Sequence, residues 1–83
     1  MKLFFKDKYS RLRQIGTVNN ATEAWTIISN FLKNYNYTCH YVRTWITQKD
    51  NKFYVVYDVG SHSEFFKVEC STQEEANNFI KIK

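Results

Sequence analysis

The chain has 83 residues, a formal net charge of +4, two cysteines and no proline. A chain of this length forms one small domain, residues 1–83, that buries only about 60% of the surface exposed by its unfolded form, so association into a homo-oligomer would add stability. The positive charge excludes a protein that imitates DNA through an acidic surface, and it favours contact with an anionic partner.

The opening segment, "KLFFKDKYSRLRQIGTV", fits neither the period of a helix nor that of a strand, so residues 1–18 are expected to be extended or mixed in conformation. Charge follows after only three apolar residues, which is too short for the apolar part of a signal peptide. No apolar run reaches the roughly 18 residues that span a bilayer. We therefore expect a cytoplasmic protein without membrane contact, in which Cys39 and Cys70 are small buried thiols or incidental residues.

Residues 21–35 are predicted to form an amphipathic helix. Asn20, followed three residues later by Glu23, is the pattern of a capping box. Apolar residues then recur at helical spacing up to Tyr35. Core packing explains Trp25 and Phe31 better than a partner-binding stripe does.

Three segments after this helix are predicted strands: residues 40–47, 52–59 and 64–70. Short polar links, "QKDN" and "GSHS", join them, which indicates an antiparallel meander. Ser71 and Glu74 repeat the capping pattern ahead of a short C-terminal helix. The predicted fold is thus α+β, an antiparallel three- to four-stranded sheet with one main helix packed on one face and a short C-terminal helix.

Both faces of the predicted sheet carry apolar and aromatic residues. Alternation places Tyr41, Arg43 and Trp45 together on one face of the first strand of the meander. Two helices are too few to cover both faces, so part of the sheet is expected to stay open or to meet a partner. Arginine beside aromatic rings recurs at protein interfaces and at stacked bases. In the alternative interpretation, both rings lie in the core and Arg43 pairs with Asp58 or Glu64.

A polar cluster separates the last two predicted strands, in the sequence "YDVGSHSEFF". As a turn, it uses Gly60 for a positive φ and Ser61 to cap backbone groups. As an anion site, the N–H groups of Gly60, Ser61 and His62 form a nest to which Arg43 adds charge. Neither a nucleophile triad nor a metal site is supported, because adjacent Ser and His side chains diverge and no metal-ligand spacing occurs.

Three stretches, "EAWTIISNFL", "YVRTWI" and "YDVGSHSEFF", resemble small proteins of unassigned role that phages and prophages of Gram-positive bacteria encode. The resemblance covers roughly residues 15–68. It implies an inhibitor that binds and disables a host factor, as anti-CRISPR and other anti-defence proteins do. Many such inhibitors are acidic mimics of nucleic acid, so a basic chain of this kind would instead bind a protein surface or a nucleotide.

The sequence therefore predicts a non-enzymatic protein that inhibits a bacterial defence system in the host cytoplasm by stoichiometric binding of one of its protein components. One alternative is a protein that sequesters a phosphorylated nucleotide, through the turn and the aromatic rings. Another is a small nucleic-acid-binding module that uses the same sheet face. No cofactor, catalytic residue or metal ligand is predicted. The candidate binding residues are Tyr41, Arg43, Trp45, Tyr57, Asp58, Ser61, His62 and Glu64.

Overall fold

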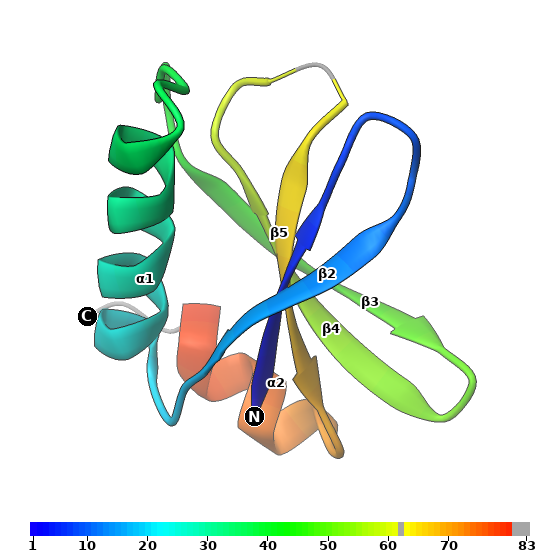
Figure 1. Ribbon diagram of the computed structural model, residues 1–83. Coiled ribbons are helices and arrows are strands. Elements are labelled where there is room, and N and C mark those ends of the chain that lie inside the picture. The colour runs from blue at the N-terminus through cyan, green and yellow to red at the C-terminus, as the bar shows by residue number, and fades with distance from the viewer. Residues whose placement is uncertain (62, 81–83) are drawn as a thin grey trace.

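A computed structural model describes residues 1–61 and 63–80 of the chain (Figure 1). These residues form an α+β domain with a five-stranded antiparallel sheet and two helices. The strands are β1 (Lys2–Lys6), β2 (Leu12–Thr17), β3 (Arg43–Lys49), β4 (Lys52–Asp58) and β5 (Phe65–Cys70), and the helices are α1 (Ala21–Asn34) and α2 (Gln73–Ile80).

The N-terminal segment forms a β-hairpin, so the predicted strand count of three to four was too low. Strand β1 pairs with β2 on one side and with β5 on the other, which gives the strand order β2-β1-β5-β4-β3. The register between β1 and β2 shifts between Leu3 and Phe4, and Ile15 falls between the paired residues. This bulge breaks the alternation from which a strand is recognised. Strand β2 is also an edge strand, and most of its residues are exposed.

The meander after α1 forms as predicted, with small differences at its ends. Strands β3 and β4 pair from Arg43 opposite Asp58, so β3 begins three residues later than expected and runs on to Lys49. The turn between them consists of Asp50 and Asn51, whose φ angles are 54° and 66°. Two successive residues with positive φ are typical of a type I′ turn, whose twist matches that of the flanking strands.

Both helices begin at a capping pair. In α1, Asn20 Oδ1 accepts a hydrogen bond of 2.9 Å from the Glu23 N–H, as the sequence predicted. In α2, Thr72 Oγ1 accepts a hydrogen bond of 3.1 Å from the Glu75 N–H. The cap of α2 therefore lies one residue beyond the predicted position at Ser71, whose N–H instead donates to the Glu75 carboxylate.

Both helices pack against the same face of the sheet. Phe66 of β5 lies at the centre of this layer, with its ring centroid 5.3 Å from that of Phe5 and 5.5 Å from that of Phe31. Trp25 is half-buried against the same core, in agreement with its predicted role. Neither described helix is long and apolar enough to cross a membrane. The core consists of Leu3, Phe5, Val18, Ala24, Ile28, Phe31, Leu32, Val55, Tyr57, Val59, Phe66, Val68, Cys70, Ala76 and Phe79.

Candidate binding surface

The sheet face opposite the helices is bare among the residues that the structure describes. Across this face, Trp45 of β3 lies opposite Val56 of β4, Val56 lies opposite Lys67 of β5, and Lys67 lies opposite Phe4 of β1. Directly opposed residues share a face of the sheet, so these four side chains form a row across four strands. We call this surface the open face and define it by Phe4, Lys6, Arg43, Trp45, Thr47, Tyr54, Val56, Phe65 and Lys67.

A shallow hollow of about 180 Å³ lies at the centre of the open face. Val56 is only 4% exposed although no described helix covers it, because the larger side chains around it shield it. The rings of Trp45 and Phe65 meet edge to face with centroids 6.4 Å apart. The Lys6 ammonium lies 5.5 Å from the Phe65 ring centroid, within cation–π range. The hollow is lined by Lys6, Trp45, Thr47, Val56, Phe65 and Lys67.

Two lysines, Lys6 and Lys67, bring positive charge to the open face. Burial lowers the pKa of Lys67, and repulsion from Lys6 and Lys49 lowers it further. An anion bound beside Lys67 would oppose both effects by favouring the charged ammonium. Glu69, opposite Tyr54, lies on the same face, but its carboxylate is 3.9 Å from Lys52 Nζ, which offsets its charge, and it accepts a hydrogen bond of 3.2 Å from the Tyr54 hydroxyl. The centre of the open face is therefore apolar and its rim is cationic.

Arg43 and Tyr41 lie at one end of the open face. The sequence left two interpretations for this region, an exposed binding surface or core rings with Arg43 in an ion pair, and the structure agrees with part of each. Arg43 Nη2 donates to the buried Asp58 carboxylate at 3.1 Å, so the expected ion pair forms. The hydrogen bond to Asp58 is the main cause of the raised pKa of Arg43. Its guanidinium also lies 5.2 Å from the Tyr41 ring centroid. Tyr41 and Trp45 are 47% and 38% exposed, so neither ring is enclosed by the core.

The turn between β4 and β5 is organised by Asp58. Gly60 has a φ of +95°, as the turn interpretation expected, and its N–H donates to Asp58 Oδ1 at 2.9 Å. That hydrogen bond removes one of the three donors of the proposed anion nest. The Ser61 hydroxyl donates to the Glu64 carboxylate, and both side chains therefore support the turn. His62 lies outside the described residues.

Tyr57 lies in the core on the helix-covered side of the sheet, away from the other candidates. Its side chain is 4% exposed, and within the described part of the chain its hydroxyl has no hydrogen-bond partner. Burial is the main cause that raises the pKa of Tyr57 to about 12. The alternation of β4 places Tyr57 opposite in direction to its neighbours Val56 and Asp58. Tyr57 and Asp58 are adjacent in sequence and are both candidate binding residues, but the pleat of β4 places them on opposite faces of the sheet.

Sequence reasoning missed the lysines and the phenylalanines of the open face. Phe65 and Lys67 alternate with the buried Phe66 and Val68 along β5, so this part of the signal was present in the sequence. The position of Lys6 beside Phe65 depends on the pairing of β1 with β5. These strands are about 60 residues apart in the chain, and short-range patterns do not predict such a pairing.

Replacing Tyr57 with phenylalanine is expected to raise the free energy of unfolding by about 1 kcal/mol. A buried hydroxyl without a hydrogen-bond partner destabilises the folded state, and phenylalanine lacks this hydroxyl. The unfolded tyrosine ionises near its ordinary pKa of 10.0, whereas the folded one ionises near 12. Wild-type stability should therefore fall as the pH rises from 10 towards 12, and the Phe variant should lack this part of the fall. Urea denaturation at neutral and alkaline pH measures both effects. Lower stability of the variant at neutral pH would show that the hydroxyl has a partner.

In the described ranges, no three His, Cys, Asp or Glu side chains lie close enough together to hold a metal ion. Comparison of the chain with protein-family models, with curated protein sequences and with solved structures found no match. The described residues form an α+β domain in which both helices cover one face of the sheet. The other face is aromatic and basic, and no described helix covers it.

Proposed function

We propose that this chain is a non-enzymatic binding protein that captures an acidic partner on its open face. The observation that carries the proposal is a group of rings and lysines on a sheet face that no described helix covers, with Trp45 and Phe65 at its apolar centre and Lys67 on its cationic rim. Protein interfaces combine an apolar centre with a polar rim, and tryptophan, tyrosine and arginine dominate their binding energy. A cationic rim steers an acidic partner to the face and orients it there.

The size of the hollow favours a protruding group of a larger partner. Pockets that enclose small molecules measure about 300–1,000 Å³, whereas this hollow measures about 180 Å³. A hollow of this size accommodates a single side chain or one base of a macromolecule. The resemblance to phage-encoded proteins supports a protein component of a bacterial defence system as the partner, bound in the host cytoplasm. In that role the chain inhibits by occluding a surface of its target.

A single-stranded nucleic acid is the second candidate partner. The alternation of rings with lysines favours it, since single strands bind by stacking their bases on aromatic side chains while cations follow the backbone. The two candidates differ in salt dependence. Phosphate contacts release counterions, so affinity for a nucleic acid falls steeply as salt is added.

The Lys67→Glu variant is expected to retain the partner at least about tenfold more weakly than the wild type, since it places a negative charge in the middle of the cationic rim. Lys33→Glu is the matched control, because it makes the same charge change on an exposed position of α1. Tagged wild type and both variants would be passed over a lysate of a Gram-positive host. A protein retained in equal amount with the wild type and with Lys33→Glu, but lost with Lys67→Glu, is the expected partner.

Titration of a short fluorescent single-stranded DNA at low and high salt completes this test. Tight binding that weakens steeply with salt and is lost in Lys67→Glu would make a nucleic acid the partner instead. Equal retention of every captured species by Lys67→Glu and Lys33→Glu, together with no DNA binding, would reject the open face as the binding surface.

A further inference from the structure

A second cleft lies at the β1–β2 hairpin, on the helix-covered side of the sheet. Figure 1 shows the turn of this hairpin and the C-terminal end of α1 at the same end of the molecule. The cleft has a volume of about 340 Å³, which is nearly twice that of the hollow on the open face and lies within the range of small-molecule pockets. Its lining residues are Phe5, Asp7, Arg11 and Arg13.

The end of α1 places a tyrosine ring near Phe5, one of the residues that line this cleft. Asn36 follows the helix with a φ of +59°, and the Tyr37 N–H donates to the Leu32 carbonyl at 2.9 Å. This is the Schellman arrangement, which reverses the chain at a helix end. It places the Tyr37 ring 5.9 Å from that of Phe5 and nearly parallel to that of Phe31. Tyr37 remains 38% exposed, so one part of its ring is free to contact a ligand.

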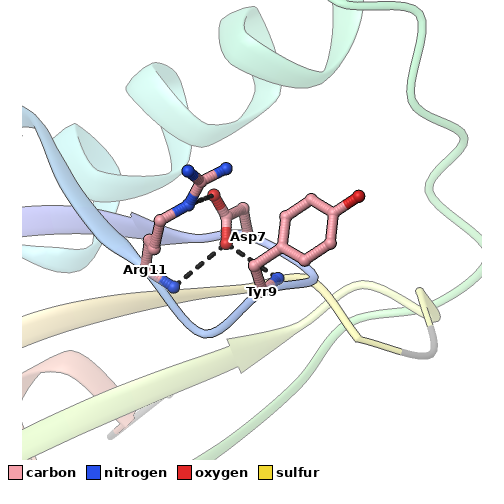
Figure 2. A network of polar contacts seen from close by, with 3 residues as sticks. All are labelled: Asp7, Tyr9 and Arg11. Carbon is pink, nitrogen blue, oxygen red and sulfur yellow. Dashed lines mark hydrogen bonds and ion pairs between the residues drawn. The ribbon is translucent and has the colours of Figure 1, made fainter.

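The hairpin turn pairs Arg11 with Asp7. Asp7 Oδ1 accepts hydrogen bonds from the N–H groups of Tyr9 and Arg11, and Asp7 Oδ2 accepts one of 3.0 Å from Arg11 Nε (Figure 2). The Arg11 backbone N–H is the main cause that lowers the pKa of Asp7, so this carboxylate stays ionised. Figure 2 marks no hydrogen bond or ion pair at the two terminal nitrogens of Arg11, whose guanidinium carbon lies 5.1 Å from the Tyr9 ring centroid.

Arg13 supplies a second guanidinium to the cleft. It is paired in register with the buried Phe5, which directs it to the helix side of the sheet. Its guanidinium carbon lies 5.7 Å from the Phe31 ring centroid and 5.9 Å from that of Tyr35. Within the described part of the chain, Arg13 forms no ion pair. The residues that line the cleft therefore include two guanidiniums and one carboxylate, and the exposed rings of Tyr35 and Tyr37 lie near two lining residues, Arg13 and Phe5.

We propose that this cleft binds a small ligand in which a phosphate group is attached to an aromatic ring system, that is, a nucleotide. Arg11 and Arg13 bind the phosphate, since guanidinium groups match the geometry of phosphate oxygens. The tyrosine rings stack on the base, because aromatic faces pack well in offset arrangements. The site is independent of the open face, which lies across the sheet. It also differs from the Gly60 turn, where the leading N–H is already bonded to Asp58.

The test is a titration of the whole chain with adenosine monophosphate, inorganic phosphate and adenosine, followed by NMR. We expect shifts of the Arg11 and Arg13 Nε signals and of the Tyr35 and Tyr37 rings. We also expect the monophosphate to bind at least about tenfold more tightly than either fragment, because it uses both halves of the site. Equal affinity for the monophosphate and for phosphate would overturn the proposal, as would no binding at millimolar concentration.

The Arg13→Gln variant is expected to bind the monophosphate at least about tenfold more weakly, since it loses a charge at the phosphate. Lys33→Gln is the matched control, because it removes one positive charge from an exposed position of α1 that belongs to neither the cleft nor the open face. It should bind the monophosphate as the wild type does. Equal binding by Arg13→Gln and by the wild type would contradict the cleft. The open-face proposal stands or falls separately, by partner capture.

Discussion

Replacing Phe66 with alanine is expected to lower the free energy of unfolding by about 3–5 kcal/mol, which is the usual cost of removing a fully buried ring. Phe66 is 1% exposed and contacts the rings of Phe5 and Phe31, so it joins two strands of the sheet to α1. The free energy of unfolding of a small domain is about 5–15 kcal/mol, and for a chain this short it is expected near the lower end of that range. The variant should therefore be largely unfolded at moderate temperature. Urea denaturation followed by circular dichroism measures the loss.

Phe65→Ala is the matched control for this result. Phe65 is the same residue type, one position earlier on β5, and its side chain lies half-buried on the open face. Its removal opens no cavity in the helix-covered core, so the variant should remain folded and lose partner binding instead. If the two variants were equally unstable, the assignment of β5 side chains to a covered face and an open face would be wrong.

Local patterns predicted the elements whose stabilising contacts are close in sequence. The cap at Asn20 and the helical spacing that follows it located α1 within one residue of its observed end. Alternation and short polar links located the meander β3-β4-β5. Each of these features depends on neighbours within a few residues or on one hairpin turn, and such contacts leave a period in the sequence.

The hairpin of β1 and β2 depends on contacts that are distant in sequence. Strand β1 is stable as an inner strand because β5 pairs with it, with Phe5 opposite Phe66. Its partner β2 lies at the edge and carries a bulge at Ile15, which interrupts the alternation of β2. In β1 the burial alternates, but three successive apolar residues, Leu3 to Phe5, hide this alternation in the sequence. Tertiary pairing thus decides the conformation of a segment whose own pattern is ambiguous.

The candidate binding surface also combines residues that local patterns predicted with residues that only distant strand pairing brings together. Arg43 and Trp45 were found because alternation along one strand placed them on a common face. The idea that two helices leave one face of the sheet uncovered also agrees with the described residues, in which both helices pack on a single side. The lysines that determine the charge of this face come from β1 and β5. Their meeting requires the full strand order, so the sequence predicted part of the apolar centre but not the cationic rim.

Replacing Gly60 with alanine is expected to cost about 3 kcal/mol, and to disturb the end of the open face. A φ of +95° is strained for any residue with a Cβ atom, at about 1–3 kcal/mol. The added Cβ would also lie 2.8 Å from His40 Cβ and 3.3 Å from the Tyr41 ring, which adds about 1–3 kcal/mol of overpacking. His40 has little freedom to move, because its N–H donates to the Val59 carbonyl at 3.0 Å. Urea denaturation measures the cost, and NMR shifts of Tyr41 and Arg43 report the displacement.

Gly16→Ala separates backbone strain at Gly60 from the general effect of adding a methyl group. At Gly16 the new Cβ would lie 2.7 Å from Ile27 Cδ1, which is the far end of a flexible side chain that can rotate away. Its cost should therefore be clearly smaller than that of Gly60→Ala. Equal losses in the free energy of unfolding for the two variants would mean that the turn at Gly60 rearranges to accommodate a side chain. In that case Gly60 would not fix the positions of Tyr41 and Arg43, and the end of the open face would adapt to its partner instead of being formed in advance.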